Sequence, residues 1–227
     1  MNEYIVSIPS KFDITSVYPF LSNVLRQDNS PISDNMIFDF TDLKFIEPVA
    51  VTALSNIIEW LKLNQVRIKI NVNVNNSAIR YLDDSGFFEY FANRKIREFA
   101  RLRSTTMPLE FINSENSYEW VNNRFAMWLT SILQISKSSI GNILMSIGEI
   151  FINISDHSEV GIGCFFAQHY PNMHEVQVSI SDFGIGIPRK VRNFDPTIKN
   201  DTEALKKAIE YGFSTQSTPQ NGCEYIL

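Results

Sequence analysis

The sequence is poor in cysteine, in net positive charge and in long hydrophobic runs, and each deficit excludes a class of protein. Its 227 residues include two cysteines, Cys164 and Cys223, too few for a disulfide framework and not spaced as a CxxC zinc pair. The net charge of −5 gives no sequence-wide basic surface for nucleic acid. No apolar run approaches the roughly 18 residues that span a bilayer, and the amino terminus lacks the features of a signal peptide. We therefore expect a cytoplasmic protein that binds neither nucleic acid nor membranes.

What is present is typical of a globular protein. Hydrophobic residues make up 44% of the chain and charged residues 20%, which excludes disordered, collagen-like and coiled-coil proteins. At roughly 100 to 200 residues per domain, the length predicts one large domain or two small ones.

The first ninety residues alternate between strand and helix patterns. Residues 36–40 form a short apolar run, and Pro48 stands where an amphipathic helix would begin. Residues 66–74 alternate between apolar and polar side chains, which predicts a strand with one face in water. Residues 77–83 predict a short helix that ends near Gly86. This order favours an α/β fold, with helices packed on a parallel or mixed sheet.

A basic segment, residues 93–104, separates this region from the rest. We interpret it as a solvated linker, with a phosphate-contacting patch as the alternative. It divides the chain into domains at residues 1–92 and 105–227. The second domain has an α+β pattern: helices over residues 117–134 and 138–156, then strands over residues 160–168 and 175–182.

The second of these helices carries a line of polar residues beside a broad apolar stripe. Glu149, Asn153 and His157 follow one another at i, i+4 and i+8, so they project from one side of the helix. A carboxylate, an amide and an imidazole in this arrangement could act on one ligand. Taken alone, the same line would also fit a solvated helix face.

The last predicted strand ends in a carboxylate and a glycine turn. Asp182 has the same parity as three apolar residues of its strand, which predicts a buried carboxylate that needs a hydrogen-bond donor. Gly184 and Gly186 follow it and would let the backbone approach a ligand closely. An Asp-x-Gly turn without any ligand is the plain alternative.

Taken together, the two segments resemble the asparagine box and first glycine box of the GHKL superfamily of ATP-binding domains, which includes histidine kinases and anti-sigma-factor serine kinases. The resemblance implies ATP and Mg²⁺ as cofactors and a Bergerat-type α/β sandwich. The boxes contain, in order, Glu149, Asn153, His157, Asp182, Gly184 and Gly186.

The resemblance also implies a role for each position. Glu149 would be the catalytic base that orients a water or hydroxyl toward the γ-phosphate, and Asn153 would ligate Mg²⁺. Asp182 would accept a hydrogen bond from the adenine amino group. Gly184 and Gly186 would give the nucleotide room.

The carboxyl-terminal part departs from the family pattern. Ser214 and Thr215 resemble the lid segment, whose hydroxyls can meet phosphates, and Gly222 is what stands for the second glycine box. The helix and strands that follow this box in the family have no counterpart, so we expect a sandwich that lacks its last elements. An apolar end at residues 225–227 then predicts self-association, or a partner that covers the sheet edge.

Residues 1–92 resemble a STAS domain, the fold of anti-sigma-factor antagonists. The resemblance lies in residues 37–47, the helix and strand that follow, and residues 82–87. In that family a serine in the turn before the helix is phosphorylated. This chain has Glu47 and Pro48 there, so the resemblance implies a domain without its switch serine.

Three functions stay open. The first is a regulatory protein that binds Mg·ATP, with or without hydrolysis, to control a protein partner. The second is a serine kinase of the anti-sigma type that acts on a separate STAS protein, in which Glu149 activates a serine hydroxyl. The third is an interaction scaffold with a degenerate pocket.

Overall fold

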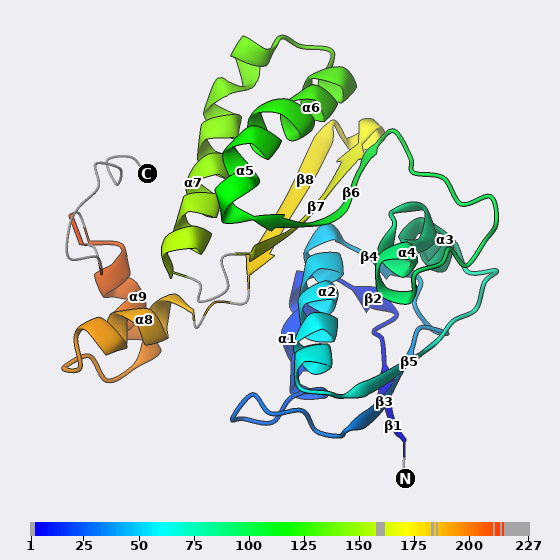
Figure 1. Cartoon of the computed structure of the whole chain (residues 1–227), viewed down its shortest axis with the longest axis horizontal. Coiled ribbons are helices and arrows are strands. Elements are labelled where there is room, and N and C mark those ends of the chain that lie inside the picture. The colour runs from blue at the N-terminus through cyan, green and yellow to red at the C-terminus, as the bar shows by residue number, and fades with distance from the viewer. Residues whose placement is uncertain are drawn as a thin grey trace.

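The computed structural model describes residues 3–157, 162–182, 184, 186–210, 212–213 and 215. The fold is mixed α/β, as expected, with a parallel sheet in the amino-terminal half and an antiparallel sheet in the second half (Figure 1). None of the described helices is both long and apolar enough to cross a lipid bilayer.

The amino-terminal half is built on two small parallel sheets. One has the strand order β1-β3-β5 and the other pairs β2 with β4. The predicted strand over residues 66–74 is confirmed but shorter, because it pairs with β3 over five residues only. The strands are β1 (Tyr4–Ser7), β2 (Lys11–Phe12), β3 (Asn35–Asp39), β4 (Phe45–Ile46) and β5 (Arg67–Asn71).

Local sequence signals set the bounds of the helices in this half. Asp13 caps the first helix, accepting hydrogen bonds from the backbone of Thr15 and Ser16. Pro48 begins the second helix, as predicted, and Gly86 adopts a φ of 85° between the third and fourth. The helices are α1 (Ile14–Ser22), α2 (Pro48–Leu63), α3 (Ser77–Asp84) and α4 (Phe87–Ala92).

The basic segment at residues 93–104 contains no helix or strand, but it is not a freely solvated linker. The fully buried carboxylate of Asp83 accepts hydrogen bonds from the backbone N–H groups of Ile96 and Arg97 and from the Arg97 side chain. Asp84 pairs with Arg97 and Arg103. The expectation of a solvated segment was therefore wrong for these two arginines: they hold the segment against α3, and their charges are already paired.

The second half is an antiparallel sheet in the order β6-β7-β8, formed by β6 (Thr106–Asn113), β7 (Ile162–Tyr170) and β8 (Glu175–Asp182). Both predicted helices are confirmed. The first is continuous but contains a π-helical turn, η1. The helical elements are α5 (Ser114–Trp120), η1 (Val121–Phe125), α6 (Ala126–Leu133), the 3-10 turn η2 (Lys137–Ile140) and α7 (Gly141–His157).

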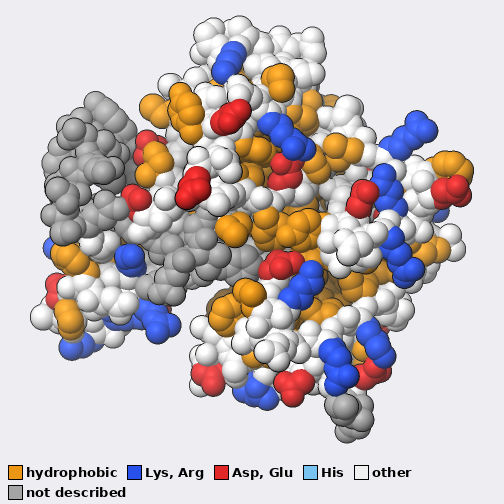
Figure 2. Space-filling view, viewed as in Figure 1, with side chains coloured by type: hydrophobic (Ala, Val, Ile, Leu, Met, Phe, Trp, Pro, Cys, Tyr) orange, Lys and Arg blue, Asp and Glu red, His pale blue; other side chains and the backbone are white. Residues whose placement is uncertain are grey.

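The antiparallel sheet lies between two layers of helix. Phe165 and Ala167 of β7 pack into the core beneath α5, α6 and α7. Cys164 and Phe166 alternate with them and pack into the amino-terminal core, against the layer that contains α2. Orange side chains gather at the centre of the face in Figure 2, where Figure 1 places the junction of α2 with this sheet. The amino-terminal core therefore extends to one face of this sheet, and a second core lies between its other face and α5, α6 and α7.

Two further helices follow β8. These are α8 (Ile187–Phe194) and α9 (Asp201–Ala208), which pack on each other beyond the ends of α7 and β8 (Figure 1). Asn200 caps α9 by accepting a hydrogen bond from the backbone of Glu203.

Candidate functional site

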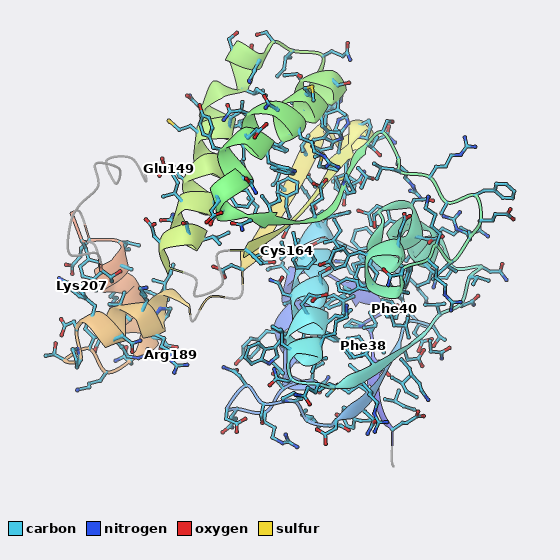
Figure 3. All side chains as sticks on the ribbon, in the orientation of Figure 1. Phe38, Phe40, Glu149, Cys164, Arg189 and Lys207 are labelled. Carbon is cyan, nitrogen blue, oxygen red and sulfur yellow. The ribbon has the colours of Figure 1, made fainter. Side chains whose placement is uncertain are left out.

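The polar line on α7 lies on an exposed face of the helix. Glu149 and Asn153 are both exposed, and neither side chain has a hydrogen bond or ion pair within the described part of the chain. Glu149 points to the side of α7 that faces away from the sheet (Figure 3). His157 ends α7, and its side chain lies outside the described residues. Two of the three predicted side chains are thus free to meet a ligand.

Glu149 also lines a groove of about 550 Å³ between α5, η1 and α7. Tyr118 and Met145 supply apolar surface there, and Lys137 donates a hydrogen bond of 2.6 Å to the backbone carbonyl of Asn122. Neither Asn153 nor Asp182 is among the lining residues. The groove therefore runs from Glu149 toward the start of α7, away from the predicted adenine site.

Asp182 is the last residue of β8, and its side chain lies on the α7 face of the sheet. Its strand neighbours on that face, Val178 and Ile180, pack into the core beneath α7, which confirms the predicted parity. The predicted burial is wrong, because Asp182 is exposed. The strand ends at this residue, so the core no longer covers the carboxylate.

Gly163 of β7 explains how α7 comes close to Asp182. It is the direct partner of Asp182 in the antiparallel pair. A Cβ atom at Gly163 would lie 2.8 Å from the ring of Phe151 and 3.0 Å from Ile154, both on α7. The missing side chain therefore lets α7 lie directly over this end of the sheet. The sequence did not predict this role for Gly163, because a lone glycine within a strand pattern does not show which helix lies above it.

The glycine turn keeps space beside the Asp182 carboxylate. The backbone N–H of Gly184 donates to Oδ1 of Asp182 at 3.2 Å. A Cβ atom at Gly184 would stand 3.0 Å from Oδ2, and Gly186 has a φ of 81°, which favours glycine. The backbone of Gly186 therefore favours glycine, whereas a side chain at Gly184 would require the Asp182 carboxylate to move. Residues 183 and 185 lie outside the described residues.

Part of the predicted lid can be placed. Oγ1 of Thr215 is buried and has no hydrogen-bond partner among the described residues. Ser214 and Gly222 lie outside the described residues. Figure 3 labels a cation on each helix before this segment, Arg189 on α8 and Lys207 on α9. Lys207 pairs with Glu210 at 2.6 Å, whereas Arg189 is exposed and unpaired within the described part of the chain.

The described side chains offer few ligands for a metal ion of their own. No group of three or more His, Cys, Asp or Glu side chains that could hold a metal ion occurs among the described residues. Magnesium that is bound together with a nucleotide would need fewer protein ligands, and the amide oxygen of the exposed Asn153 could be one of them. Exposed Glu149 and Asp182, the space beside Gly184 and the unpaired hydroxyl of Thr215 likewise fit a nucleotide.

On the opposite face of the sheet, α2 forms hydrogen bonds to β8. Oγ1 of Thr52 lies 2.7 Å from Oγ of Ser179. One turn further along α2, Nδ2 of Asn56 donates to Oγ of Ser181 at 2.8 Å and to the backbone carbonyl of Asp182 at 3.2 Å. Sequence analysis missed these contacts, because no local pattern tells which helix of one domain docks on which strand of the other.

A buried thiol and a half-buried tyrosine lie on β7, where this sheet meets the amino-terminal half. Burial raises the pKa of the Cys164 thiol well above its usual range, and hydrogen bonds with Ser55 and Ser181 only partly oppose this. Burial also raises the pKa of Tyr170 to about 12, with smaller contributions from the charges of Glu47 and Glu175. Neutral forms of these groups therefore favour the docked arrangement.

The start of α2 is the position at which the resemblance to STAS domains would place a phosphorylated serine. Glu47 precedes the helix and makes no side-chain hydrogen bond to its N-terminal N–H groups. The two hydroxyls on α2, those of Thr52 and Ser55, belong to residues that are 1% and 0% exposed. A kinase could not reach either one while α2 is docked.

Comparisons with known proteins identify the amino-terminal half. Residues 2–105 match the family model described as STAS domain. No curated protein and no solved structure matches the chain. The parallel sheet with α2 following β4 agrees with the family match, and residues 2–105 of this chain are therefore a STAS domain.

Proposed function

We propose that this chain is a regulatory protein whose second half binds Mg·ATP and whose STAS domain conveys the nucleotide state to a protein partner. The observation that carries the proposal is the meeting of two polar segments at one end of the second half. The carboxyl end of α7, with Asn153, lies beside the carboxyl end of β8, with Asp182 (Figure 1). Resemblance of the same residues to the GHKL boxes supports a nucleotide as the ligand.

Each residue has a role that its surroundings allow. Asp182 would accept a hydrogen bond from the adenine amino group, and Asn153 would hold Mg²⁺. Glu149, exposed and unpaired among the described residues, would orient the attacking oxygen as a general base. Magnesium, when bound, neutralises charge on the phosphates. The hydroxyl of Thr215 would donate to a phosphate oxygen.

The STAS domain is the regulatory element of this proposal. Its α2 packs on the face of the sheet opposite to α7, so both helices contact the strands that end at the proposed site. Because the hydroxyls of α2 are buried at this junction, phosphorylation at the family position would not release it. The control signal would be the bound nucleotide instead.

Calorimetric titration of the protein with Mg·ATP tests nucleotide binding. Asp182→Asn keeps the shape of the side chain but presents a donor to the adenine amino group, so it should cost about 1–3 kcal/mol of binding free energy. Asp42→Asn, at an exposed turn of the STAS domain, is the matched control and should bind as the wild type does. Absence of binding heat in the wild type, or equal affinity in both variants, would contradict the proposal.

A serine kinase acting on a separate STAS protein is the second candidate. The burial of Thr52 and Ser55 favours a target outside this chain, because its own STAS domain offers no accessible hydroxyl on α2. Incubation with Mg·ATP and a STAS protein that has a switch serine, followed by mass spectrometry, would distinguish the two functions. Phosphate on the added protein supports the kinase, and release of free phosphate alone supports an ATPase.

A further inference from the structure

Asn56 of the STAS domain forms a hydrogen bond to Asp182, the residue that we propose binds the adenine amino group. Asn56 lies on α2 and is half-buried at the junction. The next residue, Ile57, belongs to the hydrophobic core. Its side-chain amide donates to two consecutive residues at the end of β8, Oγ of Ser181 and the backbone carbonyl of Asp182. An amide that donates two bonds fixes the position of both acceptors relative to α2.

Asp182 is consequently held from two sides. Its carbonyl accepts from Asn56 on the STAS side at 3.2 Å, and its carboxylate accepts from the backbone N–H of Gly184 on the ligand side, also at 3.2 Å. Its strand partner, Gly163, lies beneath α7. Any movement of α2 along the sheet would therefore displace the backbone of the residue whose carboxylate faces the proposed site.

We infer that Asn56 is a positioning residue that sets the adenine selectivity of the proposed nucleotide site from within the STAS domain. This inference rests on the proposed function, since it concerns the same site. Asn56 does not touch the nucleotide; it holds the carbonyl of Asp182, so that the carboxylate of that residue stays where an adenine amino group can donate to it.

The hydrogen bond from Asn56 to Asp182 would also couple nucleotide binding to the docking of the STAS domain. If docking of α2 places Asp182 for adenine, then bound adenine must favour docking of α2 by the same free energy, because linkage between two binding events is reciprocal. A bound nucleotide would therefore stabilise the docking of α2 on the sheet. A partner that binds the STAS domain and displaces α2 would weaken nucleotide binding.

Asn56→Ala tests the inference, and Thr52→Val is its matched control. Both variants remove a hydrogen bond from α2 to β8, but Thr52 reaches Ser179 and not Asp182. Ser181→Ala is a second control, because it removes the other acceptor and leaves the bond from Asn56 to Asp182. Thermal unfolding of all three variants would show that each is folded at the temperature of the titration.

The readout is the affinity for Mg·ATP and for Mg·GTP. Guanine presents a carbonyl oxygen where adenine presents its amino group, so the ratio of the two affinities reports on Asp182. One hydrogen bond contributes roughly 0.5–1.5 kcal/mol, so Asn56→Ala should weaken Mg·ATP binding by about 2- to 10-fold and lower the selectivity by the same factor. Thr52→Val and Ser181→Ala should change the selectivity less than about twofold.

The two proposals fail in different ways. If the wild type does not bind Mg·ATP, the proposed function is overturned and this inference with it. If the wild type binds and Asn56→Ala keeps its selectivity, or loses no more of it than Thr52→Val, the inference alone is overturned, and the contact is merely structural.

A measurement on the unaltered protein serves where Asn56→Ala does not fold. The side-chain amide resonance of Asn56 should shift when Mg·ATP is added, because its acceptor lies on Asp182. The amide of Asn64, which donates to the carbonyl of Trp60 at the far end of α2, should not shift. Equal behaviour of the two resonances in a protein that binds Mg·ATP would contradict the inference.

Discussion

The helices α2 and α7 cover opposite faces of one sheet, and they use their polar residues in opposite ways. On α2, Thr52 and Ser55 are buried and hydrogen-bonded, Thr52 to β8 and to its own helix and Ser55 within the helix. On α7, Glu149 and Asn153 are exposed and unpaired within the described part of the chain. In sequence both helices show polar side chains about one turn apart beside apolar ones.

The difference teaches what separates a structural polar residue from a candidate functional one. A buried hydroxyl with a partner lowers the cost of burying α2 between two domains, so its contribution is to folding. An exposed carboxylate and amide that have no partner among the described residues contribute little to folding, which leaves them available to a ligand. We therefore expect variants of the buried hydroxyls on α2 to change stability, and variants of the exposed polar residues on α7 to change activity.

The largest expected effect is on catalysis. Glu149→Gln should lower any ATP hydrolysis or phosphoryl transfer by about 10²- to 10⁴-fold, the usual contribution of a general base, while Mg·ATP still binds. Phosphate release measured beside Glu119→Gln, an exposed carboxylate on α5, provides the control. Equal rates in the two variants would remove Glu149 from the mechanism.

The second effect is on folding. Phe166 is fully buried on the STAS side of the sheet, so Phe166→Ala should lower the free energy of unfolding by about 3–5 kcal/mol. Met145→Ala, on the exposed side of α7, should change it by less than about 0.5 kcal/mol. Urea unfolding of both variants makes the measurement. A similar loss of unfolding free energy in the two variants would show that Met145 is buried against residues outside the described part of the chain.

The third effect is a dependence of stability on alkaline pH. The thiol of Cys164 has an ordinary pKa of 9.0 that burial raises in the folded protein. The unfolded chain therefore loses this proton first, and stability should fall as the pH rises above 9.0. One proton corresponds to about 1.4 kcal/mol per pH unit, and Cys164→Ala should remove this part of the slope. Unfolding curves at several pH values from neutral to alkaline would show it. The same dependence of unfolding free energy on pH in the wild type and in Cys164→Ala would mean that the thiol is not buried from solvent.

Much of the fold was predictable where the pattern is local. The helix beginning at Pro48, the alternation around β5 and the stripe of α7 are each contained in one segment. The strand β6 was missed, because Pro108 interrupts a pattern whose pairing with β7 is distant in sequence. The helix α1 was missed for a similar reason, since Pro19 lies inside it.

The candidate site was predictable only in part. Spacing placed Glu149 and Asn153 on one helix face, and parity placed Asp182 on the correct face of its strand. The exposure of Asp182 was not predictable. Strand parity shows which face of the sheet a side chain is on, but it does not show whether the helix above still covers that position. Asn56 and Gly163 lie far from Asp182 in sequence, and they could be found only once the sheet and the docked helix were known.

The most direct test of the account is a calorimetric titration of Asn153→Ala and Thr52→Val with ATP, in the presence of magnesium and in its absence. We assign metal binding to the exposed amide on α7 and a structural role to the buried hydroxyl on α2. Magnesium should therefore strengthen ATP binding in the wild type and in Thr52→Val, and this gain should be lost in Asn153→Ala. A gain from magnesium that survives in Asn153→Ala, or that disappears in Thr52→Val while the protein stays folded, would contradict this assignment.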